Sequence, residues 1–287
     1  MRHFLRLAAA ILIAVAGTAR AGETVVVLGS DLAPYREAYE AFKVAFGAPV
    51  ELLPMGARLP KDVKVVVAFG GKAALQRYSD RTTLIYGLAP GLEVTAETHD
   101  GSNTMIRMEP EAGALLQKLT EVQPGLKRLG VIWSSEGHGS AMERLAEAIR
   151  KRGLKPVVER ISGADEMPSA LRRLKGKVDA LWLPPDPLVI NARNFEMIKS
   201  YAYGNDVPFY APVEGLAEKG AAAAVSVSNA EMGRAAATAA RDALAGELLP
   251  AEIFVSHVRL AVNLSAAREC ELTVPPSVLK AADKVSP

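Results

Sequence analysis

The stretch Val178-Asp179-Ala180-Leu181-Trp182-Leu183-Pro184-Pro185-Asp186 decides the fold, because it joins an apolar run to a rigid polar tip. A near-continuous apolar run is typical of a strand that is covered on both faces, as in a parallel sheet. The flanking prolines restrict the backbone around Asp186 and aim its carboxylate from the end of the strand. An apolar run with a small, polar or proline-rich tip recurs six more times, at Thr24–Leu28, Val63–Phe69, Thr83–Tyr86, Leu129–Trp133, Val207–Tyr210 and Ala222–Val227.

Most of these tips lead into segments with a helical period of apolar residues. Strands that alternate with helices predict the α/β class, with mainly parallel sheets. A break near residues 104–126 separates two such strand–helix systems, so the sequence predicts two α/β lobes. The clearest helical segments are Pro34–Ala45, Ser140–Gly153, Asn191–Tyr203 and Ala230–Leu244.

The first 21 residues have the pattern of a cleavable export signal. Arg2 and Arg6 precede an apolar region, Leu7–Ala16, that is too short to span a bilayer. Ala19-Arg20-Ala21 is a small-x-small cleavage site, so the mature chain is expected to begin at Gly22. A membrane anchor is the disfavoured alternative, and we expect an exported protein that is periplasmic if the source is Gram-negative.

The net charge and the cysteine content limit the kinds of partner and of disulfide that the chain is expected to have. Removing the three arginines of the leader from 34 basic residues leaves 31, against 32 acidic residues, so the mature chain has a formal charge of −1. Neither nucleic acid nor an anionic membrane is therefore expected as a partner. The single cysteine, Cys270, has no partner for an intrachain disulfide and is expected to be a buried, inert thiol.

In open parallel sheets, ligands bind just beyond the carboxyl ends of the strands, so the tips are the candidate binding positions. The amides at Gly70-Gly71-Lys72 could hold a carboxylate or phosphate at a helix start, but a tight turn that needs glycine explains them equally well. Asp186 is expected to meet an ammonium group, with an N-cap for a helix near Leu188 as the alternative. Glu214 is either a second acid of the cleft or a surface carboxylate.

Ser134 and Ser135 follow another strand and are expected to exchange hydrogen bonds with a ligand. The enzymatic alternative is a hydrolase that uses one of these serines with His138, but the Gly-x-Ser-x-Gly nucleophile elbow is absent. The histidines have no metal-ligand spacing either. We therefore expect no catalytic residues, no metal and no cofactor.

Several stretches, taken in order, resemble one family: the 178–186 stretch, then Val207–Ala211, Glu218–Ala221, Met232-Gly233-Arg234, Leu260–Leu264 and Val274–Val285, with Lys127–Trp133 before them. That family is the ABC-transporter substrate-binding proteins related to tryptophan- and other aromatic amino-acid-binding proteins, and the resemblance covers roughly residues 107–287. It implies the type I periplasmic binding fold, in which two lobes crossed by hinge segments close on a ligand. The implied first lobe is residues 22–106 plus about 228–250, and the second is 107–227 plus about 251–287.

The resemblance also implies a set of ligand-facing positions. These are Ser134, Ser135, Asp186, Glu214, Ser228 and Asn229, together with Ser30, Asp31, Gly70, Gly71 and Lys72 at the ends of the first and third strands.

The chain departs from the family in its first lobe. Between Val50 and Val65 it has no room for the long second helix of its relatives. Gly71 and Lys72 stand where relatives usually have a small polar residue and proline, and relatives usually have an acid near Ser228. We expect the binding component of an ABC importer, which closes on a small polar or amino-acid-like ligand and docks on a membrane permease. A periplasmic sensor, a degenerate binding-fold scaffold and the serine hydrolase remain alternatives.

Overall fold

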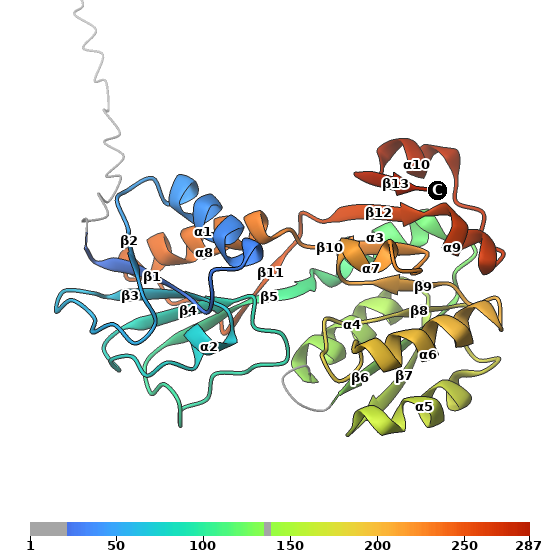
Figure 1. Cartoon of the computed structure of the whole chain (residues 1–287), viewed down its shortest axis with the longest axis horizontal. Helices are drawn as coiled ribbons and strands as arrows, with labels where there is room; N and C mark the ends of the chain where they lie inside the picture. Colours follow the sequence, from blue (N-terminus) through green and yellow to red (C-terminus); the bar gives the residue numbers. More distant parts are fainter. Residues whose placement is uncertain (1–21, 135–138) are drawn as a thin grey trace, which may run out of the picture.

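The computed structural model describes residues 22–134 and 139–287. The expected export signal, Ser135 and His138 therefore lie outside the described residues. The chain forms two α/β lobes joined by several crossing segments (Figure 1). This confirms the predicted two-lobed α/β fold with mainly parallel sheets.

The first lobe contains a parallel sheet with the strand order β11-β5-β4-β3-β1-β2. Its strands are β1 (Thr24–Leu28), β2 (Glu51–Leu53), β3 (Val65–Phe69), β4 (Thr83–Gly87), β5 (Asn103–Pro110) and β11 (Glu252–Val255). Its helices are α1 (Ala33–Phe46), α2 (Gly71–Ala74) and α8 (Asn229–Leu244). Residues 54–64 connect β2 to β3 without a helix, in agreement with the shortened lobe inferred above.

The second lobe contains a sheet with the order β13-β12-β10-β9-β8-β6-β7, in which the β10–β12 pair is antiparallel. Its strands are β6 (Arg128–Ser134), β7 (Lys155–Ile161), β8 (Ala180–Trp182), β9 (Phe209–Ala211), β10 (Ala223–Ser226), β12 (Arg259–Asn263) and β13 (Lys284–Ser286). Its helices are α3 (Ala112–Val122), α4 (Gly139–Lys151), α5 (Met167–Leu174), α6 (Ala192–Tyr203), α7 (Glu214–Ala217), α9 (Leu264–Glu269) and α10 (Pro276–Ala281).

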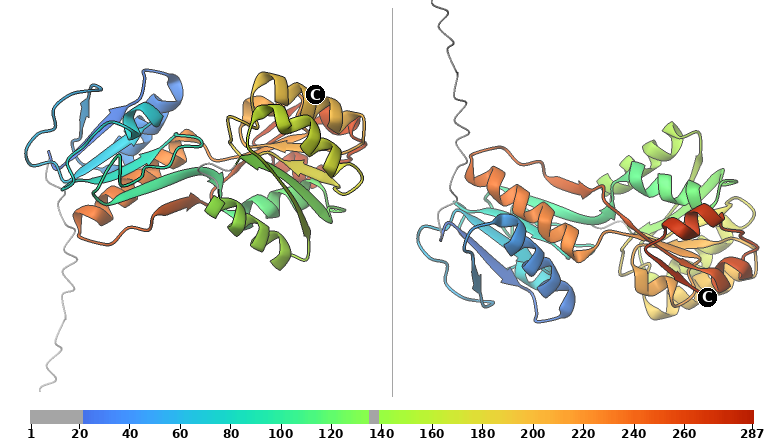
Figure 2. Two further views of the ribbon diagram at one scale, coloured as in Figure 1. Left: turned by 90° about the horizontal axis from the view of Figure 1, so that it is seen from below. Right: turned by 90° about the horizontal axis from the view of Figure 1, so that it is seen from above.

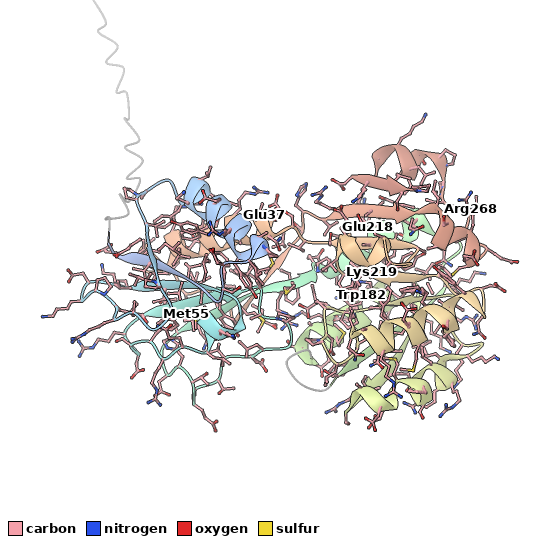
Figure 3. The ribbon with its side chains drawn as sticks, viewed as in Figure 1. Glu37, Met55, Trp182, Glu218, Lys219 and Arg268 are labelled. Atoms are coloured by element: carbon pink, nitrogen blue, oxygen red, sulfur yellow. The ribbon has the colours of Figure 1, made fainter. Side chains whose placement is uncertain are left out.

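The apolar strands are buried on both faces, as their composition predicts. All five residues of β3 are buried, and they alternate between two hydrophobic clusters on opposite sides of the sheet. One cluster is covered by α1 and α8, and the other by α2 and the irregular chain that includes Tyr78 and Val94. In the second lobe, Trp182 is 1% exposed and lies among the packed side chains (Figure 3).

Helices α1 and α8 approach until their backbones touch. A Cβ atom added at Gly233 would overlap the carbonyl oxygen of Ala38 and crowd the amide nitrogen of Phe42. Glycine is therefore required at position 233 by the close packing of two helices that are far apart in the sequence. The late helix α8 thus completes the core of the first lobe.

The predicted lobe boundaries need correction. The boundaries after residues 106 and 250 both come too early, because β5 continues to Pro110 and β11 (Glu252–Val255) pairs with β5 in the first sheet. Helix α3 begins only at Ala112, with Glu111 as its N-cap. Arg107 and Glu109 interrupt the apolar run of β5, and β11 has only three apolar residues after Glu252, so the sequence pattern missed both strands.

The buried thiol of Cys270 gives a test of the second lobe. This side chain is 3% exposed, and burial, assisted by the charges of Asp206 and Glu269, raises its pKa from 9.0 to about 12. We expect an aromatic disulfide reagent to leave native Cys270 unmodified at pH 8 and to modify it fully in denaturant. Rapid modification of the native protein would contradict the described packing.

The raised pKa also sets a pH dependence. Above pH 9 the Cys270 thiol ionises in the unfolded chain but stays protonated in the folded protein. The stability contributed by burying the neutral thiol is therefore fully present below pH 9 and is lost as the pH rises toward 12. A Cys270→Ala variant should therefore lose less unfolding free energy than the wild type between pH 9 and 11, measured by urea denaturation.

Candidate functional site

The strand directions make the tips of the two lobes face each other. Strand β5 leaves the first sheet toward the second lobe, and β4, β3 and β1 run parallel to it. Strand β10 leads back to α8 of the first lobe, and β9, β8 and β6 run parallel to β10. The carboxyl ends of both sets therefore point at the interlobe region, where open α/β sheets bind ligands (Figure 1).

Three segments cross between the lobes. They are the link from β5 to α3 at Glu111, the link from β10 to α8 at Val227 and Ser228, and residues 256–258 between β11 and β12. Short crossings of this kind allow one lobe to rotate against the other as a rigid body.

The tip of β3 is shaped by its glycine. Gly70 has a φ of +106°, and a Cβ atom there would lie 3.1 Å from the ring of Tyr35. The alternative of a turn that needs glycine therefore accounts for Gly70. Helix α2, which starts at this tip, has only four residues, of which Gly71 is half-buried and Lys72 is exposed.

Ser30 and Asp31 lie on the exposed tip of β1, next to the β3 tip. Asp31 forms an ion pair with Arg36 of α1, and the hydrogen bond from that guanidinium lowers the pKa of Asp31. Because both side chains of this pair are largely exposed, it stabilises the lobe little and leaves Asp31 accessible.

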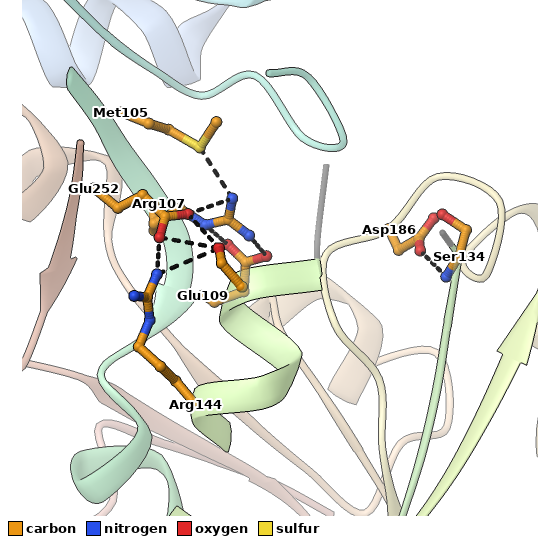
Figure 4. A network of polar contacts seen from close by, with 8 residues as sticks. Met105, Arg107, Glu109, Ser134, Arg144, Asp186 and Glu252 are labelled. Carbon is orange, nitrogen blue, oxygen red and sulfur yellow. Dashed lines mark hydrogen bonds and ion pairs between the residues drawn. The ribbon is translucent and has the colours of Figure 1, made fainter. Parts of the chain in front are cut away.

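In the second lobe, the structure brings Ser134 and Asp186 together. The Asp186 side chain is 1% exposed, and its Oδ2 accepts a hydrogen bond of 2.7 Å from the backbone N–H of Ser134 (Figure 4). Its Oδ1 accepts from the N–H of Leu188 at 2.9 Å. Asp186 thus ties the end of β6 to the loop after β8. It does not cap a helix, because α6 begins at Ala192 and its N-cap is Asn191.

Asp179 forms a matching tie at the other end of the same strands. Its Oδ2 accepts from the backbone N–H groups of Lys127 and Arg128, and its Oδ1 pairs with the Arg128 side chain at 2.7 Å. Burial on its own would raise the pKa of Asp179, but the hydrogen bonds from Arg128 and the backbone outweigh it and lower the pKa. The two aspartates therefore fix β6 against β8 at both ends.

The remaining predicted site residues have partners within the protein. Glu214 lies in the first turn of α7 and contacts Lys284 Nζ at 3.0 Å. Ser228 is the N-cap of α8, because its Oγ accepts from the N–H of Glu231 at 3.1 Å. Asn229 donates to Glu37 of α1 at 2.9 Å. Ser228 and Asn229 thus anchor the second crossing to the first lobe, and Glu214 contacts the edge of the second sheet.

A group of charged residues at the hinge was missed by the sequence analysis. Arg107 of β5 is 2% exposed, donates to both carboxylate oxygens of Glu109 at 3.0 and 2.6 Å, and lies 3.2 Å from Glu252 of β11. From the second lobe, Ser140 Oγ donates to Glu252 at 3.0 Å, and Arg144 forms an ion pair with it (Figure 4). We call these five residues the hinge charge cluster. An Arg-x-Glu pattern inside an apolar segment is the signal that could have revealed it, since alternate strand residues share a face.

Two cavities adjoin the hinge charge cluster. A cavity of about 10 Å³ lies between the lobes, lined by the chain after β4, by Arg107 and Glu109, and by Pro185 of the second lobe. A larger, mainly apolar cavity of about 410 Å³ lies between α3 and α4 and is bounded by Phe254 of β11 and by Trp182. The hinge charge cluster therefore contributes lining residues to both cavities.

The two described histidines of the mature chain have local partners. His99 Nε2 lies 3.2 Å from the Thr82 carbonyl oxygen, and His257 Nδ1 lies 3.0 Å from Glu231 Oε1. Within residues 22–134 and 139–287, no group of His, Cys, Asp or Glu is arranged to hold a metal ion. In the same part of the chain, no helix has both the length and the apolar character needed to cross a bilayer.

The hinge charge cluster makes a prediction about stability. Arg107→Met would leave the buried carboxylate of Glu109 without its two-pronged partner, so we expect a loss of about 3–5 kcal/mol of unfolding free energy. Arg173→Met is the control, because Arg173 pairs with Glu159 at the surface and should cost less than about 1 kcal/mol. Urea denaturation followed by circular dichroism measures both. Equal losses in the two variants would contradict the buried role of Arg107.

Comparison with known proteins gives relatives of the same architecture. A curated relative, the tyrosine-binding protein of Clostridioides difficile (strain R20291), is 25% identical over 163 residues, which are 56% of this chain and 46% of the relative. The match thus spans about half the length of that relative.

Solved structures show the same fold along nearly the whole chain. An ABC domain in complex with L-Trp from Streptococcus pneumonia has a TM-score of 0.60 and 20% identity, and covers 93% of this chain and 100% of its own. A ligand-free, open substrate-binding protein with adhesive properties from Clostridium difficile has a TM-score of 0.64 and 19% identity, with 92% and 98% covered. A conserved domain protein from Vibrio cholerae has a TM-score of 0.62 and 18% identity, with 92% and 99% covered.

The sequence itself gives the family. Residues 85–286 match the family described as ABC transporter substrate binding protein, which is well over half of the chain. This match confirms the resemblance inferred from the sequence. The chain belongs to the ABC transporter substrate-binding protein family.

Proposed function

We propose that this protein is the exported binding component of an ABC importer and that its lobes close on an amino-acid-like ligand. The observation that carries the proposal is the opposition of two sets of strand tips across three short crossings. Such an arrangement can enclose a small molecule by a hinge rotation, which buries the ligand between preformed tips. Membership of the family supports a membrane permease as the partner of the closed form.

The ligand class is argued from the chemistry of the tips and from the relatives. The relative from Clostridioides difficile is named for tyrosine, and the neighbour from Streptococcus pneumonia holds L-Trp. A free amino acid carries an ammonium and a carboxylate, so its site needs an acid on one side and donors on the other. This chain offers Asp186 in one lobe and exposed Lys72 in the other.

We assign the ammonium group of the ligand to Asp186, with Glu214 as a secondary acid because Lys284 already contacts it. Asp186 follows β8 at the carboxyl edge of the second sheet, which is the edge where open α/β sheets bind ligands. The carboxylate or hydroxyl end of the ligand would meet donors of both lobes. The full proposed set is Ser30, Asp31, Gly70, Gly71, Lys72, Ser134, Ser135, Asp186, Glu214, Ser228 and Asn229.

The first test is a thermal-shift screen of residues 22–287 against amino acids, small organic acids, purines and polyamines. A ligand at about a hundred times its dissociation constant adds ~2.7 kcal/mol to the stability of the folded state. We expect a zwitterionic amino acid to raise the melting temperature and the purines to leave it unchanged. If no amino acid shifts the transition, the proposed ligand class is wrong.

The paired aspartates give a sharper prediction. Asp186→Asn weakens the hydrogen bonds from the backbone N–H groups of Ser134 and Leu188, and Asp179→Asn weakens those from Lys127 and Arg128, so each should lower stability by about 1–3 kcal/mol. Only Asp186→Asn, at the interlobe end, should also weaken ligand binding, by about 10- to 100-fold in titration calorimetry. Comparable weakening in both variants would mean that Asp186 acts through the stability of the lobe and not through contact with the ligand.

A further inference from the structure

We propose that Ser140 and Arg144 of α4 form a latch on Glu252 of β11 that holds the lobes apart. Ser140 Oγ lies 3.0 Å from both carboxylate oxygens of Glu252, and the Arg144 guanidinium forms an ion pair with the same carboxylate. Helix α4 belongs to the second lobe and β11 to the sheet of the first, so these contacts join the lobes directly and not through a crossing segment.

The first lobe presents Glu252 as a fixed docking point. Arg107 of the same lobe lies 3.2 Å from Glu252 Oε1, and both side chains are largely buried. Phe254, two residues further along β11, contacts two cations, with the guanidinium carbon of Arg107 6.0 Å and that of Arg144 4.9 Å from its ring centre. The ring face and the carboxylate together orient the Arg144 guanidinium, which makes the contact specific to one relative position of α4 and β11.

The latch lies on the far side of the hinge from the tips of β1 and β3. In the first sheet β11 is the edge strand on one side of β5, whereas β4, β3 and β1 follow on the other side. Figure 2 (left) shows β11 and α4 on one side of the molecule, with α1 and α2 on the opposite side. A rotation about the crossings that brings the β1 and β3 tips toward the second lobe therefore carries β11 away from α4.

The tips themselves do not oppose this latch. Among the residues that the structure describes, no hydrogen bond or ion pair joins the tips of β1 and β3 to the second lobe. Among the described residues, the polar contacts of α4 with Glu252 therefore have no counterpart at the tips of β1 and β3. They bias the ligand-free protein toward parted lobes.

One consequence rests on the proposed function. If ligand binding requires closure, the latch lowers the apparent affinity by reducing the fraction of molecules in the closed arrangement. The latch itself is independent of the ligand and can be tested without one.

The experiment measures interlobe distances in the ligand-free protein. Nitroxide labels at Val44→Cys on α1 and Arg193→Cys on α6 occupy exposed positions in different lobes, and the buried Cys270 stays unlabelled. We expect Arg144→Ala to add a population with shorter distances in double electron–electron resonance. A partly exposed ion pair of this kind should shift the ratio of parted to closed molecules by about two- to fivefold.

Lys151→Ala is the matched control, because Lys151 lies on the same helix but pairs with Glu147 inside the second lobe. It should leave the distance distribution unchanged, while Ser140→Ala should give a smaller shift in the direction of Arg144→Ala. The latch is wrong if Arg144→Ala and the wild type have the same distribution, or if Lys151→Ala shifts it as much as Arg144→Ala. Either result leaves the ligand screen above unaffected, so the two proposals fail separately.

Discussion

The buried guanidinium of Arg107 is the interaction on which the arrangement of the two lobes depends. A charge at 2% exposure is tolerated only with close partners, and here Glu109 and Glu252 supply them. Glu109 precedes the first crossing, and Glu252 lies in β11, which the chain reaches after α8 and before the third crossing. The need to neutralise one cation therefore fixes how β11 pairs with β5 and where two of the crossings begin.

Such a buried cluster is weak evidence for net stability, because desolvation offsets much of the attraction between the charges. The cluster instead determines the positions of neighbouring groups. The cluster places a carboxylate at the edge of the first sheet, within reach of α4 in the second lobe. The same residues that end the first lobe thus form the surface against which the second lobe rests.

The polar side chains at the strand tips mostly hold the tips in place. Asp186 ties β6 to the loop after β8, Ser228 caps α8, and Asn229 bonds to α1. These internal bonds make the tips rigid, which lowers the entropy that a ligand must overcome on binding. A site whose supporting bonds form before the ligand arrives can be selective with few direct contacts.

The elements that could be predicted from the sequence are those with continuous or regularly spaced apolar residues. Strands such as β3 and helices with a clear period, such as α1, lie where the sequence places them. Strands β5 and β11 were not predicted, because charged residues such as Arg107 and Glu252 are typical of a surface segment unless the partner strand that pairs with them is known. The importance of Gly233 was equally invisible, since it depends on contact with Ala38, almost two hundred residues earlier.

The candidate site divides in the same way. Sequence placed Ser134 and Asp186 at the ends of strands, and the structure brings them within hydrogen-bond distance. The sequence could not show that Glu214 contacts Lys284 at the far edge of the sheet, because that ion pair joins a short helix to a strand near the chain end. Long-range pairs of charges carry no local pattern from which they could be read.

The order in which the chain is made has a consequence for how the lobes are built. Helix α8 covers the face of the first sheet that also receives α1, so residues 24–110 on their own present an unfinished apolar surface. The second lobe in turn lacks β12 until the chain has returned from the first. During synthesis, segments of the first lobe therefore alternate with segments of the second. A nascent chain cannot complete the first lobe before it starts the second. A cut at either of the first two crossings would leave both lobes incomplete, whereas a cut after β11 would leave only the second lobe without β12 and β13.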